Sequence, residues 1–184
     1  MYHTASEILL PPNMVDYLDT NSKFGDALIV RDGVVQASTV RSTRVCLRDD
    51  NDWVAQFCRH HVQVINEDVY KFHLNDGFDS GKYQYAHYNV GDYYSWHQDN
   101  IWKHNQIWDR KLSFSLLLND DYDGGYFEFV EPIYGEELTW NITRVPTKAG
   151  TLIVFPSMMA HRVTPVTNGT RKSVVGWCVG RQFA

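Results

Sequence analysis

After Gly81 the chain is a succession of short β-rich segments separated by turn residues, and this pattern limits the possible folds more than any other feature of the sequence. Clusters of Gly, Asp, Asn and Pro, such as Asp123-Gly124-Gly125 and Thr167-Asn168-Gly169, separate the segments. The expected strands are 82–89, 93–97, 111–119, 126–130, 138–145, 151–155, 161–166 and 172–179. About eight short strands are typical of a β-sandwich or barrel.

The N-terminal third mixes helix with extended segments. A helix can start at Pro12 and continue to about Leu18, because proline is tolerated in a first turn. A clearer helix is expected from Asp52 to about Glu67, where apolar residues recur at helical spacing after an acidic start that suits the helix dipole. The expected fold is therefore mainly β with supporting N-terminal helices.

Length and composition indicate one folded domain. The chain has 184 residues, 43% of them hydrophobic, which is enough for one real core and disfavours a two-domain enzyme. We expect a single domain over 1–184, with helical support over about 1–80 and a β core over about 81–181.

Charge and cysteine usage disfavour several classes of protein. The net charge is −5 and no basic run is present, so a nucleic-acid partner is not expected. There is no leader-like segment and no apolar run of the ~20 residues that a membrane helix needs, so a membrane or exported protein is not expected. Cys46, Cys58 and Cys178 lack the spacing of a disulfide framework or a thiolate zinc site, which favours the cytoplasm.

The segment 112–118 has two distinct faces if it is extended. One face carries Leu112, Phe114, Leu116 and Leu118, and the other carries Ser113, Ser115 and Leu117. We expect the apolar face to lie beneath the N-terminal helices. The serine-bearing face would then line an interior cavity.

His97 and Asp99 are two residues apart, so on an extended chain their side chains project from the same face and can reach one metal ion. His161, which follows the buried strand expected at 151–155, can supply a third ligand. Two histidines and one carboxylate form the facial triad that holds ferrous iron and leaves open positions for an oxoacid and dioxygen. The remaining histidines show no ligand pattern and are expected to be surface or core residues: His3, His60, His61, His73, His87 and His104.

Ten residues beyond His161, the last expected strand begins with Arg171 and Ser173 on one face, together with Val175 and Trp177. A guanidinium that faces a cavity is suited to a two-pronged bond with a planar carboxylate, and the serine can donate one more hydrogen bond to it.

Together these segments resemble the 2-oxoglutarate/Fe(II)-dependent dioxygenases, and within them the prolyl 4-hydroxylase-like group that includes the PKHD-type hydroxylases. The resemblance covers about residues 83–181. It rests on ordered motifs: Tyr88-Asn89-Val90-Gly91, His97-Gln98-Asp99-Asn100, Arg110-Lys111-Leu112-Ser113-Phe114-Ser115, Leu118-Asn119, Gly124-Gly125, Ala149-Gly150, Phe155-Pro156-Ser157, His161-Arg162-Val163-Thr164-Pro165-Val166, Gly169-Thr170-Arg171-Lys172-Ser173 and Trp177.

The resemblance implies a double-stranded β-helix (jelly-roll) core supported by helices. It implies that His97, Asp99 and His161 bind Fe(II), and that Arg171 binds the distal carboxylate of 2-oxoglutarate with help from Tyr88 and Ser173. The implied enzyme is a hydroxylase that consumes 2-oxoglutarate and O2, releases succinate and CO2, and is supported by ascorbate. The substrate that the resemblance favours is an amino-acid residue, prolyl before any other, in a peptide or as a free small molecule.

Some positions depart from the family pattern. Tyr126 follows Gly124-Gly125 where relatives often have an acidic residue, and Ser115 and Leu117 stand where some relatives have Tyr or Thr. Trp177 occupies the position where nucleic-acid demethylases of the superfamily carry a second arginine, which disfavours base repair. Residues 100–109, with Trp102 and Trp108, directly follow the metal-ligand pair and are expected to form a mobile flap over the substrate. The alternative is a surface loop whose tryptophans pack against the body of the protein.

Two alternatives remain open at this point. A non-catalytic module on the same barrel could hold a small ligand. The absence of a triad member or of the arginine would support this hypothesis, but all four residues are present. A zinc hydrolase could use the same three ligands, but it would leave Arg171 without a role.

Overall fold

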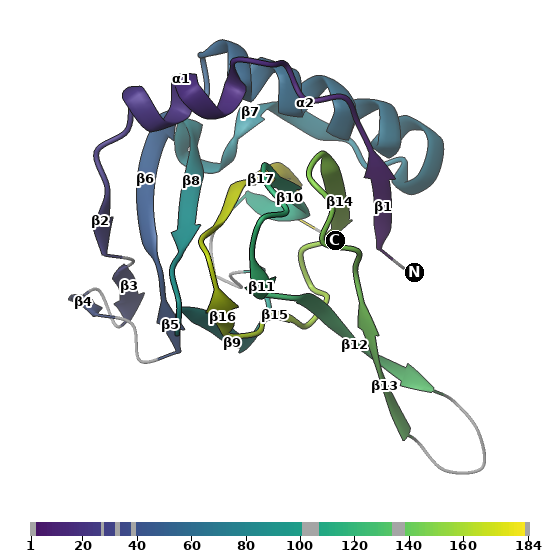
Figure 1. Cartoon of the computed structure of the whole chain (residues 1–184). Coiled ribbons are helices and arrows are strands. Elements are labelled where there is room, and N and C mark those ends of the chain that lie inside the picture. Colours follow the sequence, from purple (N-terminus) through teal and green to yellow (C-terminus); the bar gives the residue numbers. More distant parts are fainter. Residues whose placement is uncertain are drawn as a thin grey trace.

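In the computed structural model, the described residues are 3–26, 28–31, 34–37, 40–100, 107–133 and 139–182. Most of them lie in antiparallel strands, and two helices run across one side of the molecule (Figure 1). No helix in these ranges is long and apolar enough to cross a membrane. The architecture is thus mainly β with helical support, as the spacing of the turn residues predicts.

The larger sheet of the described chain has eight strands in the order β1-β14-β10-β17-β8-β6-β2, and β7 also pairs with β17. Their bounds are β1 Thr4–Glu7, β2 Gly25–Asp26, β6 Arg44–Asp49, β7 Leu74–Phe78, β8 Lys82–Tyr88, β10 Trp108–Leu117, β14 Thr151–Pro156 and β17 Arg171–Arg181. The first 80 residues therefore supply strands as well as helices.

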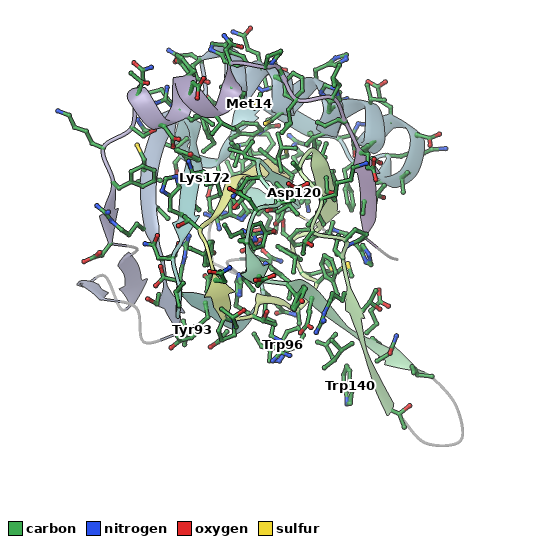
Figure 2. All side chains as sticks on the ribbon, in the orientation of Figure 1. Met14, Tyr93, Trp96, Asp120, Trp140 and Lys172 are labelled. Atoms are coloured by element: carbon green, nitrogen blue, oxygen red, sulfur yellow. The ribbon has the colours of Figure 1, made fainter. Side chains whose placement is uncertain are left out.

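The smaller sheet has five strands in the order β13-β12-β15-β9-β5. Their bounds are β5 Arg41–Ser42, β9 Tyr93–His97, β12 Phe127–Ile133, β13 Thr139–Arg144 and β15 His161–Val163. Two short pairs complete the described strands: β3 Leu28–Arg31 with β4 Val34–Ala37, and β11 Asp123–Gly124 with β16 Val166–Asn168. The hairpin of β12 and β13 projects from the body, and its Trp140 is exposed to solvent (Figure 2).

Helix α1 spans Met14–Thr20 and helix α2 spans Trp53–Ile65. The Asp52 side chain caps α2 by accepting a hydrogen bond from the backbone N–H of Ala55 at 2.9 Å. The segment η1, Asn66–Tyr70, continues α2 as a π-helical turn, and a short 3-10 turn, η2, spans Asp79–Gly81. Both α-helices lie on the same side of the larger sheet (Figure 1).

The main core lies between these helices and the larger sheet. Leu112, Phe114 and Leu116 of β10 belong to the same buried cluster as Val54 of α2 and Leu18 of α1. Burial of each such side chain contributes about 1.5–3 kcal/mol. The expectation that the apolar face of 112–118 lies beneath the helices is therefore confirmed.

A second apolar cluster fills the space between the two sheets. Ile153 and Phe155 come from the larger sheet, whereas Phe127, Phe129 and Val163 come from the smaller one. The two sheets thus pack face to face with a shared interior, which is the jelly-roll arrangement expected from the sequence.

Several element boundaries differ from the sequence expectation. The first helix begins at Met14 and not at Pro12, and β10 begins at Trp108, three residues before the expected start at Lys111. Trp108 therefore pairs with Arg181 as part of a strand and does not belong to a flap, while Trp102 lies outside the described residues. The expected strand 161–166 is split into β15 and β16, with Pro165, which has no N–H to donate, between them.

Candidate active site

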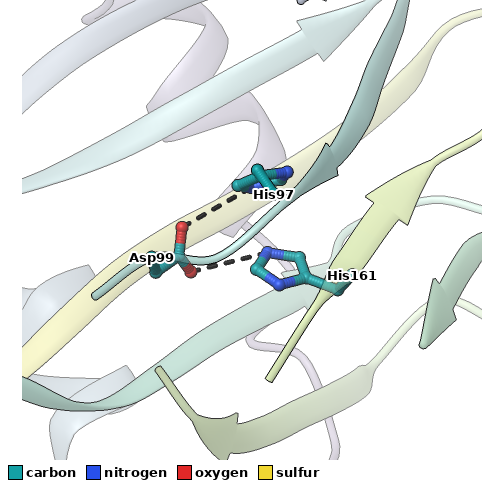
Figure 3. A group of neighbouring side chains, drawn as sticks. All are labelled: His97, Asp99 and His161. Carbon is teal, nitrogen blue, oxygen red and sulfur yellow. Dashed lines mark ion pairs between the residues drawn. The ribbon is translucent and has the colours of Figure 1, made fainter. Parts of the chain in front are cut away.

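The three predicted metal ligands meet at one point of the smaller sheet. His97 ends β9, Asp99 follows two residues later, and His161 begins β15, directly opposite His97 in the strand register. One ligand atom from each residue lies within 4.8 Å of the others. The Nε2 atoms of His97 and His161 are each 3.5 Å from a different oxygen of Asp99 (Figure 3).

Backbone carbonyls fix the orientation of both histidine rings. His97 Nδ1 is 2.8 Å from the carbonyl oxygen of Ser95, and His161 Nδ1 is 2.9 Å from that of Met159. Because a carbonyl can only accept, Nδ1 carries the proton and donates it in both rings. Each Nε2 is therefore left with a free lone pair that points toward Asp99, as a metal ligand requires.

Asp99 is held by its own backbone and by its neighbours. The backbone N–H groups of Asp99 and Asn100 both donate to the carbonyl oxygen of Ser157, at 2.9 and 3.0 Å. The Ser157 hydroxyl is in turn 2.9 Å from that of Ser113 on β10. The turn that carries Asp99 is thus tied to the strands behind it, which positions the carboxylate before any ligand binds.

Burial and mutual charge set the protonation states of the site. Burial alone would raise the pKa of Asp99, but its interactions with His161, His97 and Ser113 outweigh burial, so this pKa lies well below its usual range. Burial lowers the pKa of His161 to about 4, against the opposing charge of Asp99. Near neutral pH the site therefore offers a carboxylate and a neutral imidazole, the forms that bind metal ions.

Aromatic side chains enclose the two histidines. The Phe127 ring stacks on His161 with centroids 5.3 Å apart, and Phe155 contacts the same imidazole edge-on at 4.6 Å. Tyr94 stacks on His97 at 3.5 Å. These rings limit both ring rotation and water access. The donor set of two imidazoles and one carboxylate, with room on the pocket side, fits Fe(II).

Arg171 begins β17 and is almost fully buried, with 1% of its surface exposed. Its Nη1 donates to the Ser173 hydroxyl at 2.9 Å, whereas its buried Nε and Nη2 have no hydrogen-bond partner. A buried guanidinium is costly unless an anion pairs with it. The two unused N–H groups match the two-pronged geometry of a carboxylate.

The other two predicted cosubstrate residues lie beside Arg171. Tyr88 is its register partner on β8, and the guanidinium carbon is 5.3 Å from the centre of the Tyr88 ring. Ser173 accepts a hydrogen bond from Arg171 but is not among the residues that line the pocket, so it supports the arginine from behind.

One pocket joins the metal-ligand cluster to Arg171. Tyr88 lines this pocket. Of the two residues that depart from the family pattern on β10, Ser115 lines the pocket and Leu117 does not. Its lining also includes residues that sequence reasoning did not assign to the site: Arg41, Gln84, Tyr94, Phe127, Phe155 and Val163. Of the other histidines, His104 lies outside the described residues, and the described ones do not join the cluster.

The fold and this arrangement of residues agree with a family assignment from the sequence. The family model described as the 2OG-Fe(II) oxygenase superfamily matches residues 83–179, which is more than half of the chain. The chain therefore belongs to this superfamily, as its motifs indicate. The name of the superfamily states the cosubstrate and the metal, 2-oxoglutarate and Fe(II).

Within the superfamily, the curated relatives that match include PKHD-type hydroxylases. One from Synechococcus sp. (strain CC9902) is 40% identical over 91 residues, which is 48% of this chain and 36% of the relative. Another from Parvibaculum lavamentivorans is 38% identical over 94 residues, 50% of this chain and 39% of the relative. The matched region thus spans well under half the length of these relatives.

Solved structures share the fold over nearly the whole chain. A Pseudomonas putida prolyl-4-hydroxylase aligns with a TM-score of 0.63 and 23% identity, covering 99% of this chain and 93% of the other. A viral collagen prolyl hydroxylase from Paramecium Bursaria Chlorella virus-1 aligns with a TM-score of 0.67 and 16% identity, covering 98% and 97%. At these identities the likeness supports the jelly-roll fold alone.

Proposed function

We propose that this chain is an Fe(II)- and 2-oxoglutarate-dependent hydroxylase. His97, Asp99 and His161 would hold the metal, and Arg171 would hold the distal carboxylate of 2-oxoglutarate, with Tyr88 and Ser173 supporting it. When bound, the iron and its cosubstrate supply the oxidation: O2 is consumed, 2-oxoglutarate becomes succinate and CO2, and a substrate C–H bond becomes C–OH.

The observation that carries this proposal is the pairing of two features in one pocket. The donor set for a divalent metal faces the same pocket as a buried arginine with two unused N–H groups. A 2-oxoacid with a second carboxylate can bind the metal at one end and the guanidinium at the other. A zinc hydrolase would use only the first feature, and Arg171 would then remain buried without an anion.

The residues around the ligands have supporting roles in this proposal. Phe127 and Phe155 keep water away from His161, and Tyr94 holds the ring of His97. Asp99 occupies the carboxylate position, so a halide has no vacant ligand site there, which favours hydroxylation over halogenation. Ascorbate would support activity by returning oxidised iron to the ferrous state.

A prolyl residue, in a peptide or as a free amino acid, is the substrate that we propose. The support lies in names: the curated relatives are PKHD-type hydroxylases, and the structural neighbours include a Trichoplax adhaerens prolyl hydroxylase in complex with a peptide fragment. We further propose that residues 1–184 act as one catalytic domain in the cytoplasm, and the three free, buried cysteines agree with a reducing environment.

Anaerobic titration tests the proposal. Addition of Fe(II) and then 2-oxoglutarate should produce the weak visible charge-transfer band of a chelated 2-oxoacid. His161→Ala should abolish the band, while His60→Ala, which removes an exposed histidine of α2, should leave it intact. If the wild-type protein gives no band, the proposal is contradicted. The zinc hydrolase and the non-catalytic ligand-binding module would then be the hypotheses to test.

A further inference from the structure

We propose that Arg41 binds a carboxylate of the substrate, so that the substrate is an acid: a free amino acid, or a peptide that presents a carboxylate to the pocket. This inference rests on the proposed function, because it assigns the remaining positive charge of the same pocket. It concerns the substrate and not the metal or the cosubstrate.

Arg41 reaches the pocket through the edge of the smaller sheet. It lies on β5 and pairs in register with Tyr94 on β9. Its guanidinium carbon lies 4.8 Å from the centre of the Tyr94 ring, and that ring stacks on His97 at 3.5 Å. The Nη2 group donates to Gln84 Oε1 at 3.0 Å. A single aromatic ring therefore separates the guanidinium from a metal ligand, and all four residues line one pocket.

The charge of Arg41 is not neutralised within the described residues. The neighbouring Arg110 pairs with Asp79 at 2.6 Å, and Arg162 pairs with Glu128 at 2.7 Å. In the same described ranges, neither Arg41 nor Arg171 has a carboxylate within ion-pair distance. The Nε of Arg41 is also buried without a hydrogen-bond partner. An unsatisfied buried donor is unfavourable, and an anionic ligand removes that cost.

Two guanidinium groups that lack an ion pair in one pocket offer sites for two anionic groups. In the proposed function, one carboxylate of 2-oxoglutarate lies at the metal with the keto group, and the other lies on Arg171. The cosubstrate therefore has no carboxylate left for Arg41. Asp99 is the acidic side chain in the described lining, and it belongs to the metal-ligand cluster. Within the part of the chain that the structure describes, this leaves a carboxylate of the substrate as the anion for Arg41.

A second unused donor points to the same kind of ligand. Trp177 lines the pocket, and its Nε1 is buried without a partner. The Arg110 guanidinium lies over the Trp177 ring at 4.0 Å and holds it in place. The unassigned part of the pocket thus offers N–H groups from Arg41 and Trp177, which suit a ligand rich in acceptor oxygens such as a carboxylate.

Matched pairs of acid and amide test the inference. The probes are L-proline against L-prolinamide, a Gly-Pro-Gly peptide with a free against an amidated C-terminus, and an amidated peptide with Glu against Gln beside its proline. Binding to the anaerobic Fe(II)–2-oxoglutarate complex is followed by calorimetry. We expect the wild-type protein to bind one acid at least about tenfold more tightly than its amide, a typical effect of a charge pair. The pair that shows the preference identifies the source of the carboxylate.

Variants of Arg41 decide whether this arginine is responsible. Arg41→Gln should reduce the acid-to-amide ratio to nearly one, and Arg41→Lys, which keeps the charge but not the two-pronged geometry, should retain part of it. Arg44→Gln removes the same charge from an exposed position on β6 and should leave the ratio unchanged. The ratio compares two ligands on one variant, so it does not depend on how much of that variant is folded.

The outcomes separate this inference from the proposed function. If the charge-transfer band forms but no acid binds more tightly than its amide, or no probe binds, the inference is overturned and the proposed function stands. An acid preference that survives undiminished in Arg41→Gln also overturns it. If the wild-type protein gives no band, the proposed function fails and the inference fails with it.

Discussion

His97 and His161 face each other across neighbouring strands, with their ring centroids 4.1 Å apart and Asp99 contacting both. The pairing of β9 with β15 brings together ligands that are far apart in the sequence. Because each Nδ1 donates a hydrogen bond to a backbone carbonyl, the lone pairs of both Nε2 atoms point toward Asp99.

Removal of either histidine should abolish tight metal binding. His97→Ala or His161→Ala leaves two of three ligands, and we expect Fe(II) affinity to fall by at least about 10–100-fold, the range found even for losses in the supporting shell. Anaerobic calorimetry with Fe(II) measures this directly, and the slow conversion of 2-oxoglutarate to succinate without substrate should disappear in parallel. Iron-dependent turnover that persists in both variants would mean that other residues hold the metal.

Arg171→Leu should weaken 2-oxoglutarate binding far more than it changes metal affinity. Loss of a charge-assisted, two-pronged pair in a buried site costs on the order of 2–5 kcal/mol, which is tens- to thousands-fold in affinity. Titration of the charge-transfer band with 2-oxoglutarate gives the value. Arg181→Leu, at the exposed end of the same strand, is the matched control. An unchanged 2-oxoglutarate affinity in Arg171→Leu would remove this arginine from the site.

Gly150 precedes the buried strand β14, and its replacement by alanine should destabilise the fold. Its φ is +84°, and an added Cβ would lie 2.4 Å from the carbonyl oxygen of Ile8. The free energy of unfolding should fall by about 2–4 kcal/mol, from backbone strain together with the clash. In Gly25→Ala the new Cβ meets no atom within 4 Å, so the loss there should be small. Equal denaturation midpoints for the two variants would contradict this account.

Much of the site could be predicted from the sequence because the relevant contacts follow from local periodicity. Arg171 and Ser173 share a face because both lie in the extended strand β17. The short spacing of His97 and Asp99 also brings them together, although β9 ends at His97 and Asp99 follows it. The turn residues that separate the strands similarly predict the β core. These local rules do not reveal which strands become neighbours.

Arg41 was not predicted for that reason, and Tyr94 was not predicted for a different one. Arg41 enters the pocket only because β5 pairs with β9, and no local pattern predicts this pairing. Tyr94 is three residues before His97, so strict alternation would place them on opposite faces. An irregularity in the register between β9 and β15 lets both side chains line the pocket.

The boundary of the second helix was also set by contacts that a periodicity argument cannot detect. The pattern predicts a helix to about Glu67, but α2 ends at Ile65 and continues as the turn η1. The Asn66 side chain accepts a hydrogen bond from the N–H of Phe72 and donates one to its carbonyl, at 3.0 and 2.9 Å. This pairing turns the chain at Lys71, whose φ is +58°.

His87 should make the fold less stable in mild acid. Burial lowers the pKa of His87 to about 4, and the charges of Lys172 and Arg44 act in the same direction. The charge of Asp19 opposes this shift, with Asp19 Oδ1 3.5 Å from His87 Nε2. The rings of Phe24 and Tyr85 cover the imidazole, at 4.1 and 4.7 Å between centroids. Protonation is therefore unfavourable in the folded protein compared with the unfolded chain, where the ordinary value is 6.5.

The sign of the effect follows from these two pKa values. Above pH 6.5 His87 is neutral in both the folded and the unfolded protein, so its protonation does not affect the free energy of unfolding. Between pH 6.5 and about pH 4 only the unfolded chain takes up the proton, so the free energy of unfolding falls as the pH falls. We expect a loss of about 1–2 kcal/mol from this residue between about pH 7 and pH 5. Chemical denaturation in EDTA, which keeps metal binding out of the comparison, should show a smaller loss for His87→Gln than for the wild-type protein. His60→Gln, at an exposed position, should match the wild type, and the same pH slope in His87→Gln would show that other groups cause the acid sensitivity.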